Sequence, residues 1–503
     1  MQCQNKRVYD IVVVGAGGAG AVVAARLSED PGRRVLVLEA GPLEVGPELL
    51  DARRVPGAEP DHPAAVAYPV RLTPDRPWIV PRGRILGGST TINGGYFVRA
   101  RREDFDRWAA AGNAAWTYDS VLPFLRDLET DLDYRTGDMH GHDGPMLVRR
   151  TRLDHPAAEA FGKAAAVLGF PADPDKNDQR PPGFGPVPCN VEAGIRRNTG
   201  LSYLPPSVRA RPNLTVVGGC HATRIVTERG RVTGVLTQDA VIPAASVVLC
   251  AGAFGTAHLL LLSGIGPRGD LERMGIPVVR SAPVGAGFSD HPQLVLEWPP
   301  LPDLGDPVDN WIGGCLHLAS GDAAGGPGNL EILQSLAPAA FFVSDLTPSA
   351  TGTLRLRSAD PLVLPAIDYN YLSVPGSLRR LREGVRVAMG LLDSLGLPSP
   401  FGLPSPSGPP SPSGPPSPSG PPSSAVLADD RSLDRWIRRH LGTSQHTCGT
   451  APMGSVADEF GRVHGVAGLR IADTSLLPDV PQRGPAATAV LIGEVVADNI
   501  RRS

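Results

Sequence analysis

Residues 9–20 read Tyr-Asp-Ile-Val-Val-Val-Gly-Ala-Gly-Gly-Ala-Gly, an apolar, β-branched run that leads directly into a glycine-rich turn. An alanine- and valine-rich segment over residues 21–28 predicts a helix, and a second apolar run over residues 35–38 ends in Glu39. Strand, glycine-rich turn, helix, strand and acid, in this order, form the fingerprint of a dinucleotide-binding βαβ unit. The stretch therefore predicts an α/β fold with a parallel sheet.

The residues of this fingerprint have separate expected roles. Gly15 permits the tight turn, Gly17 lets the backbone approach a pyrophosphate, and Gly20 allows the helix to pack closely. Gly18 lies between them, at the start of a helix whose N–H groups and dipole favour an anion. Glu39 is placed to accept the ribose hydroxyls of an adenosine. The turn is thus expected to bind the ADP half of a cofactor.

A second match to the same glycine pattern, residues 264–269, follows an apolar helix instead of a strand. We interpret it as a helix C-terminus, with glycine ending the helix and Pro267 preventing its continuation. One genuine fingerprint indicates one dinucleotide. Because enzymes that bind both a flavin and a nicotinamide usually need two, FAD is favoured over a nicotinamide cofactor.

Further strands and helices are predicted along the chain. Strands are expected at residues 214–217, 222–227, 231–237 and 246–250, with the second and third forming a hairpin. Strand-like segments between residues 353 and 369, and helices over residues 377–395 and 433–440, indicate a second region with its own sheet. The architecture expected is a parallel core with an antiparallel insertion, followed by that second region.

Composition excludes several classes of protein. The chain has 503 residues, 42% of them hydrophobic, and a formal net charge of -3, which gives no electrostatic basis for binding nucleic acid. Its six cysteines show no zinc-site or disulfide spacing, and a secretory signal and a membrane-spanning run are both missing from the pattern. A cytoplasmic protein is expected, with any membrane contact peripheral and at the inner face.

Residues 398–424 repeat Ser-Pro-Ser-Gly-Pro-Pro almost without interruption. Neither a helix nor a strand ladder tolerates that density of proline, so the tract is expected to be polyproline-like or disordered. We interpret it as a tolerated surface insertion, with a docking tract for a partner as the alternative.

Two further motifs carry chemistry. Residues 83–95 read Gly-Arg-Ile-Leu-Gly-Gly-Ser-Thr-Thr-Ile-Asn-Gly-Gly, where glycines and small hydroxyl residues let backbone N–H groups face a flat or anionic ligand. Residues 444–454 read Ser-Gln-His-Thr-Cys-Gly-Thr-Ala-Pro-Met-Gly. With the fingerprint and residues 252–266, these motifs resemble the glucose-methanol-choline (GMC) oxidoreductase family, in the family's order and over nearly the whole chain.

The resemblance implies a Rossmann-like FAD-binding domain interleaved with a second α+β substrate-binding domain. Residues 7–292 would form the N-terminal FAD-binding region, residues 293–397 the substrate-binding region, and residues 425–500 a C-terminal region that completes the FAD domain, with residues 398–424 as the insertion. Besides the fingerprint, the residues implied to contact FAD are Gly87, Gly88, Ser89, Asn93, Asp473, Pro485 and Ala486. Some members attach FAD through a histidine where this chain has Ile92, so non-covalent FAD is expected.

His446 is the implied catalytic base, which takes the alcohol proton as hydride passes to the flavin. The family usually has His or Asn at a second active-site position, and here that position falls on Gly484, which has no side chain to bind a substrate oxygen. Three alternatives follow. His446 acts alone; or Arg483, Gln445 or Gln482 substitutes; or a bulky substrate uses the space.

Other candidates are weaker. His140 and His142, with Asp138 and Asp143, lack further ligands at metal-site spacing, so no metal is expected. His291 lies in a segment that resembles a family loop near the flavin and is interpreted as structural. Cys448 is interpreted as a small packed residue.

Within the family, residues 444–450 and 482–488 most resemble the mycofactocin-associated branch. That resemblance implies a dehydrogenase that reoxidises reduced mycofactocin and passes electrons through FAD to respiratory carriers, with a large substrate in the space at Gly484. The first alternative is an FAD dehydrogenase or oxidase of a small or aliphatic alcohol, as in choline dehydrogenase. The second is a hydroxynitrile-lyase-type enzyme, which binds FAD without redox turnover.

Overall fold

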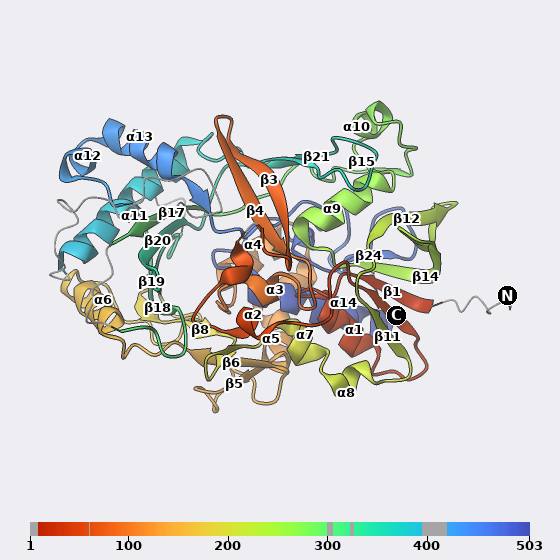
Figure 1. Ribbon diagram of the computed structural model, residues 1–503, viewed down its shortest axis with the longest axis horizontal. Coiled ribbons are helices and arrows are strands. Elements are labelled where there is room, and N and C mark those ends of the chain that lie inside the picture. The colour runs from red at the N-terminus through yellow and green to blue at the C-terminus, as the bar shows by residue number, and fades with distance from the viewer. Residues whose placement is uncertain (1–8, 60, 299–304, 322–325, 395–419) are drawn as a thin grey trace.

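A seven-stranded sheet is built around the fingerprint in the computed structural model, which describes residues 9–59, 61–298, 305–321, 326–394 and 420–503 (Figure 1). The strand order is β11-β2-β1-β14-β13-β12, and β24 also pairs with β14. The strands are β1 (Tyr9–Val14), β2 (Val35–Leu38), β11 (Leu214–Val217), β12 (Ala222–Glu228), β13 (Arg231–Thr237), β14 (Val241–Leu249) and β24 (Leu469–Ile471). The pairs β11–β2, β2–β1, β1–β14 and β14–β24 are parallel, whereas the pairs β12–β13 and β13–β14 are antiparallel. The predicted parallel core with an antiparallel insertion is confirmed.

The C-terminal part of the chain completes this first unit. Helix α1 (Gly20–Leu27) packs against α14 (Ala486–Arg502), and β24 extends the sheet from the same C-terminal segment. The helices approach closely because α14 has a glycine at the crossing: a Cβ at Gly493 would lie 2.7 Å from Cβ of Val22. The mixed α/β fold implied by the motifs therefore depends on segments from both ends of the chain.

A six-stranded sheet forms the second unit, in the order β23-β17-β20-β19-β18-β7. Its strands are β7 (Phe184–Pro186), β17 (Pro292–Glu297), β18 (Ile312–Leu318), β19 (Leu330–Leu336), β20 (Ala339–Asp345) and β23 (Gly442–Thr443). Helices α6 (Pro156–Val167) and α11 (Pro375–Ser394) pack against it. The two units are interleaved, since β7 and β23 come from segments far from β17–β20.

The strands of this second sheet differ from the sequence prediction. The segments predicted between residues 353 and 369 are β21 (Thr353–Arg355) and β22 (Ala366–Asp368), and they join the hairpin of β3 (Ala65–Thr73) and β4 (Arg76–Gly83) in a separate four-stranded sheet. Strands β18 and β19 were missed because nearly every residue in them is buried. Strands buried on both faces lack the alternation that marks a half-buried strand.

The remaining helices agree with the predictions where these were made. The predicted helices over residues 377–395 and 433–440 correspond to α11 and to α13 (Asp430–His440), although residue 395 lies outside the described residues. Gly264, with φ of +79°, follows the end of helix α9 (Gly252–Leu262), as expected for a helix C-terminus. The other helices are α2 (Pro47–Leu50), α3 (Ser89–Ile92), α4 (Arg102–Ala110), α5 (Tyr118–Asp127), α7 (Thr199–Tyr203), α8 (Pro206–Arg209), α10 (Arg268–Arg273) and α12 (Ser424–Ala428).

The structure covers only in part the predicted proline-rich tract and the residues relevant to a membrane-spanning helix. The proline-rich tract predicted over residues 398–424 lies outside the described residues, except for residues 420–424, which lead into α12. Within the part of the chain that the structure describes, none of the helices combines the length and the apolar character needed to span a bilayer.

Candidate active site

A cavity of about 1370 Å³ runs from the fingerprint to the second sheet. It is larger than the roughly 300–1,000 Å³ of typical small-molecule pockets, so it can hold an elongated cofactor together with a substrate. Its walls come from the fingerprint turn, the 83–95 stretch, the segment around His446, the start of α14, and strands β19 and β20 with the loops beside them. The motifs identified in the sequence therefore meet at one cavity.

The fingerprint glycines divide into two kinds. A Cβ at Gly20 would lie 1.9 Å from the carbonyl oxygen of Gly15, and a Cβ at Gly15 would lie 2.5 Å from that of Cys250, so the protein's own packing requires both glycines. Gly17 and Gly18 line the cavity, and a Cβ at Gly17 would meet no protein atom closer than 3.8 Å. The protein itself does not need a glycine at position 17, which fits a surface kept bare for a ligand.

Glu39 also borders this end of the cavity, at the end of β2. Its carboxylate is buried, and its two oxygens accept N–H bonds from Ala16 (2.9 Å) and Gly41 (2.9 Å). Each carboxylate oxygen has a second acceptor position, so the group can also accept ribose hydroxyls.

The 83–95 stretch lies directly on the fingerprint turn. The N–H of Gly87 donates to the carbonyl of Ala16 at 2.8 Å, and a Cβ at Gly88 would lie 2.8 Å from the Cα of Gly17. Gly88 also has φ of +53°, which side chains rarely adopt. Gly88, Ser89 and Asn93 line the cavity, whereas Gly87 packs behind it. The two glycine-rich segments thus form one wall.

Asp473 borders the cavity but is occupied by other contacts. One oxygen accepts the Gly252 N–H (2.9 Å) and the Thr256 hydroxyl (2.6 Å), while the other accepts the N–H and the hydroxyl of Ser475. It therefore fixes the start of α9 beside the cavity. Pro485 and Ala486 line the cavity at the beginning of α14, whose N-terminal N–H groups favour negative charge.

His446 is held in place through its backbone. Its N–H donates to Oδ1 of Asp290 at 2.8 Å, and the guanidinium of Arg82 binds both neighbours, donating to the Gln445 carbonyl (2.7 Å) and the Thr447 hydroxyl (2.8 Å). Gln445 has φ of +62°, an uncommon left-handed conformation. The imidazole lines the cavity. The segment around His446 is therefore fixed from both sides.

The imidazole of His446 contacts a second histidine. Nδ1 of His446 lies 3.0 Å from Nδ1 of His291, with the two ring planes nearly perpendicular. Burial lowers the pKa of His446 to about 3, with the nearby Arg82 charge acting in the same direction, and burial also holds the pKa of His291 well below its usual range. Both rings are neutral near pH 7. His291, interpreted from the sequence as structural, therefore contacts the predicted base directly.

The other ring nitrogen of His446 faces the glycine at the second active-site position. A Cβ at Gly484 would lie 3.3 Å from Nε2 of His446 and 3.0 Å from Cδ1 of Tyr96. The Tyr96 ring thus occupies space that a side chain at position 484 would need. This geometry does not favour the idea that Gly484 opens room for a bulky substrate.

The three side chains considered as substitutes for that residue lie differently. Gln445 lines the cavity, whereas neither Arg483 nor Gln482 does. The buried guanidinium of Arg483 donates to the backbone carbonyl groups of Gly328 and Gln482. The Arg483 guanidinium is therefore bound to backbone groups outside the cavity lining.

Sequence reasoning missed four residues of the site: Arg82, Tyr96, Asp290 and Glu331. Tyr96 and Glu331 line the cavity and are joined by a hydrogen bond of 2.7 Å. A tyrosine after the Asn-Gly-Gly sequence is a local signal for Tyr96. Glu331 had none, because its strand was not predicted.

The residues weighed as a metal site do not converge. Asp138, His142 and Asp143 are exposed, whereas His140 is buried. Its ring nitrogens face other carboxylates, Glu129 and Asp131 on one side and Asp175 on the other. Despite the opposing effect of burial, hydrogen bonds to these carboxylates raise the pKa of His140 to about 10. The group is an ionic network in which the imidazole carries the positive charge.

The sequence of this chain matches a known protein family and individual relatives along nearly its whole length. Residues 9–293 and 348–493 match the N- and C-terminal models of the GMC oxidoreductase family. The chain is 32% identical to 5-(hydroxymethyl)furfural oxidase of Methylovorus sp. (strain MP688), covering 98% of both chains. It is 31% identical to an oxygen-dependent choline dehydrogenase of Sinorhizobium medicae (strain WSM419), covering 98% of this chain and 95% of the relative.

A solved structure is similar over the same extent. Pyridoxine 4-oxidase from Mesorbium loti superimposes with a TM-score of 0.86 at 25% identity, over 98% of this chain and 99% of that one. The turn at Gly17, which carries no side chain, the adjoining wall at Gly88 and the length of the cavity fit FAD. FAD is the cofactor that the present chain binds. The chain belongs to the GMC oxidoreductase family.

Proposed function

We propose that the protein oxidises an alcohol to a carbonyl compound, with His446 as the base that accepts the hydroxyl proton. The observation that carries this proposal is the position of His446: its Nε2 faces the cavity beside Gly484, next to the walls made by the glycine-rich motifs. A substrate hydroxyl near Nε2 would lie between the base and the cofactor site. Alcohol oxidation needs this arrangement of base and acceptor.

Bound FAD supplies the acceptor for a hydride. The residues that would hold it are Gly15, Gly17, Gly18 and Glu39 at the ADP end, and Gly88, Ser89, Asn93, Pro485 and Ala486 near the flavin. Gly20, Gly87 and Asp473 would act indirectly, by shaping the turn and the start of α9. Ile92 has no nucleophilic atom, so we retain the proposal that FAD is bound non-covalently.

The contact with His291 determines which nitrogen of His446 serves as the base. One of the two facing Nδ1 atoms carries the proton of their 3.0 Å hydrogen bond. We assign this proton to His446, because its Nε2 then keeps a lone pair directed at the cavity. His291 would accept that bond and hold the reactive tautomer.

The rate of flavin reduction is expected to change by less than about twofold between pH 8 and pH 5, because a base with a pKa of about 3 stays neutral across this range. A histidine with its ordinary pKa near 6.5 would lose roughly 30-fold in its neutral fraction over the same interval. Anaerobic stopped-flow absorbance at saturating alcohol measures this rate. A decline with an apparent midpoint near pH 6.5 would contradict the low pKa.

Replacement of Gly484 by asparagine, which restores the usual side chain at this position, is expected to lower kcat/KM about tenfold or more, because it displaces the Tyr96 ring beside His446 and a misplacement of about 1 Å in a site can cost roughly 100-fold in rate. The new Cβ would lie within 3.0 Å of the Tyr96 ring. Steady-state kinetics of Gly484→Asn, with Gly484→Ala as the smaller change, measures the effect. Combination with Tyr96→Ala should recover part of the loss. Unchanged kinetics in Gly484→Asn would show that Tyr96 does not occupy this space.

The finer proposal for the substrate remains reduced mycofactocin, with electrons passed to respiratory carriers on the cytoplasmic side of the membrane. It is supported by the resemblance of residues 444–450 and 482–488 to that branch of the family. The alternative is a smaller alcohol, and the names of the two relatives above supply candidates, 5-(hydroxymethyl)furfural and choline.

One experiment separates these possibilities. The purified flavoprotein is mixed anaerobically with reduced mycofactocin, with 5-(hydroxymethyl)furfural or with choline, and flavin absorbance near 450 nm is followed. Fast bleaching by the small alcohols alone would contradict the mycofactocin proposal. Flavin that is bleached by no alcohol would contradict alcohol oxidation and favour a non-redox role of the lyase type.

A further inference from the structure

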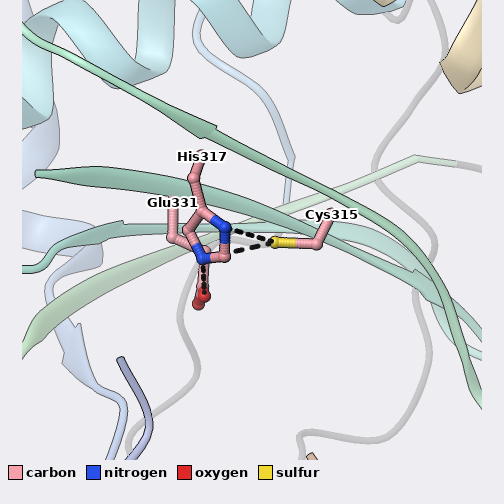
Figure 2. A group of neighbouring side chains, drawn as sticks. All are labelled: Cys315, His317 and Glu331. Atoms are coloured by element: carbon pink, nitrogen blue, oxygen red, sulfur yellow. Dashed lines mark hydrogen bonds and ion pairs between the residues drawn. The ribbon is translucent and has the colours of Figure 1, made fainter. Parts of the chain in front are cut away.

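A cluster of three buried side chains lies on the second sheet, beyond Tyr96 as seen from His446. Cys315 and His317 are two residues apart on β18, and Glu331 is the partner of His317 on the neighbouring strand β19 (Figure 2). Residues two apart in a strand point to the same face. The ligand atoms of the three residues lie within 4.8 Å of one another. Of the three, only Glu331 lines the cavity.

The two oxygens of Glu331 differ in their contacts. Oε2 accepts hydrogen bonds from the Tyr96 hydroxyl at 2.7 Å and from Nε2 of His317 at 2.9 Å. Burial and nearby cations hold the pKa of His317 well below its usual range, so this neutral ring donates through Nε2. No nitrogen or hydroxyl of the described residues donates to Oε1. The Glu331 side chain is only 5% exposed. Its Oε1 is therefore a buried acceptor at the cavity wall without a nitrogen or hydroxyl donor among the described residues.

Two cations act on this carboxylate. Burial raises the pKa of Glu331, and the charges of Arg483 and Lys176 oppose this rise without cancelling it. Lys176 is itself buried and paired with Asp173 at 3.1 Å. Because Arg483 and Lys176 already place positive charge near Glu331, a further cation would be repelled by them. A neutral hydrogen-bond donor therefore suits Glu331 better than an ammonium group or a divalent metal ion.

Aromatic rings border the same end of the cavity. Trp311 and Phe342 pack edge to face, with ring centroids 5.8 Å apart, and both line the cavity with Tyr96. The Tyr96 ring itself spans the distance between the two polar ends: one edge adjoins the space beside His446 and Gly484, and its hydroxyl reaches Glu331. A molecule lying along this ring would place one end at His446 and the other at Glu331.

We propose that Glu331 is a specificity-determining residue, whose Oε1 accepts a hydrogen bond from a second hydroxyl of a neutral, ring-bearing alcohol while the first hydroxyl faces His446. The proposal rests on the proposed alcohol oxidation and names the class of substrate: a neutral diol whose hydroxyls are separated by about the length of a tyrosine side chain. Cys315 and His317 support the carboxylate from behind.

A pair of matched probes tests this assignment. 1,4-Benzenedimethanol has a second hydroxyl at the required distance, and 4-methylbenzyl alcohol has the same ring without it. A hydrogen bond to a carboxylate typically strengthens binding by about 10- to 150-fold. In the wild-type holoenzyme, kcat/KM for the diol is therefore expected to exceed that for the mono-alcohol by at least about tenfold. The two equivalent ends of the diol account for only a factor of two, and choline is expected to be the poorest of the three.

Variants of Glu331 test whether the preference for the diol depends on this carboxylate. In Glu331→Leu the preference for the diol over the mono-alcohol is expected to fall to about twofold, mainly through a rise in the KM for the diol relative to the KM for the mono-alcohol. Glu331→Gln keeps the shape and a neutral acceptor, so an intermediate preference is expected. Glu297→Leu is the matched control, because Glu297 is exposed on β17 of the same sheet and does not line the cavity. Flavin absorbance and thermal unfolding confirm that each variant is folded.

Several measurable results would contradict the proposed role of Glu331. A wild-type preference near twofold, or a preference that survives in both Glu331 variants, would overturn the assignment while leaving alcohol oxidation intact. Flavin that neither probe reduces, but that another alcohol does, would overturn the ring-diol class. Elemental analysis gives a separate check: one zinc ion per wild-type chain, lost in Glu331→Leu, would make the carboxylate a metal ligand and overturn its role toward substrate.

Discussion

Flavin reduction by alcohol is expected to slow about a thousandfold or more in His446→Ala, because positioned general bases typically contribute 10²–10⁴-fold. The loss should appear in the rate constant for reduction at saturating alcohol, since the base acts on the proton that leaves during the chemical step. FAD should remain bound. The contacts that shape the glycine-rich walls do not involve the His446 imidazole. Anaerobic stopped-flow absorbance measures the rate, and the visible spectrum gives the FAD content.

His464→Ala is the matched control for this experiment. His464 is an exposed histidine on the same C-terminal segment and does not line the cavity, so its removal should leave the reduction rate unchanged. His446→Gln adds a second comparison, because it keeps a polar side chain without a base of similar strength. Retained turnover in both His446 variants would contradict the assignment and direct attention to Gln445, another polar residue at this end of the cavity.

FAD affinity is expected to fall about 10- to 100-fold in Gly17→Ala, as expected for the loss of a hydrogen bond worth 1.5–3 kcal/mol to a charged group. The added methyl group would stand on the wall that the cofactor must approach, while meeting no protein atom closer than 3.8 Å. The protein without cofactor should therefore unfold at an unchanged temperature. Titration of the apoprotein with FAD, followed by the change in flavin fluorescence, measures the affinity.

Gly20→Ala separates a cofactor effect from a packing effect. A Cβ at Gly20 would lie 1.9 Å from the Gly15 carbonyl oxygen, inside the protein, so this variant should lose thermal stability even without FAD. The two glycines belong to the same motif and are three residues apart. Substitution of Gly17 is nevertheless expected to weaken FAD binding, whereas substitution of Gly20 is expected to lower the stability of the protein itself. Wild-type FAD affinity in Gly17→Ala would show that the pyrophosphate does not approach the turn at this residue.

Sequence patterns predicted the first unit of the fold well. The run at residues 9–14, the glycine turn, and the strands at residues 35–38, 214–217 and 222–237 all form as expected, because each is a local pattern of polarity and turn residues. The second sheet was anticipated, but its strands were placed at residues 353–369. Strands β18 and β19 are buried over almost their entire length and so have no alternation of buried and exposed residues to reveal them.

The sequence by itself determined the dinucleotide turn, the family and the candidate base, since these depend on glycines and a histidine in local motifs. Only the tertiary structure decided what surrounds that base. Tyr96, His291 and Glu331 come from three distant segments. The contact of His291 with His446 and that of Tyr96 with Glu331 depend on sheet register and on the packing of two units against one cavity. Such contacts leave no periodic trace in the chain. For that reason the sequence showed a missing side chain at Gly484, whereas the structure shows the tyrosine ring that occupies its place.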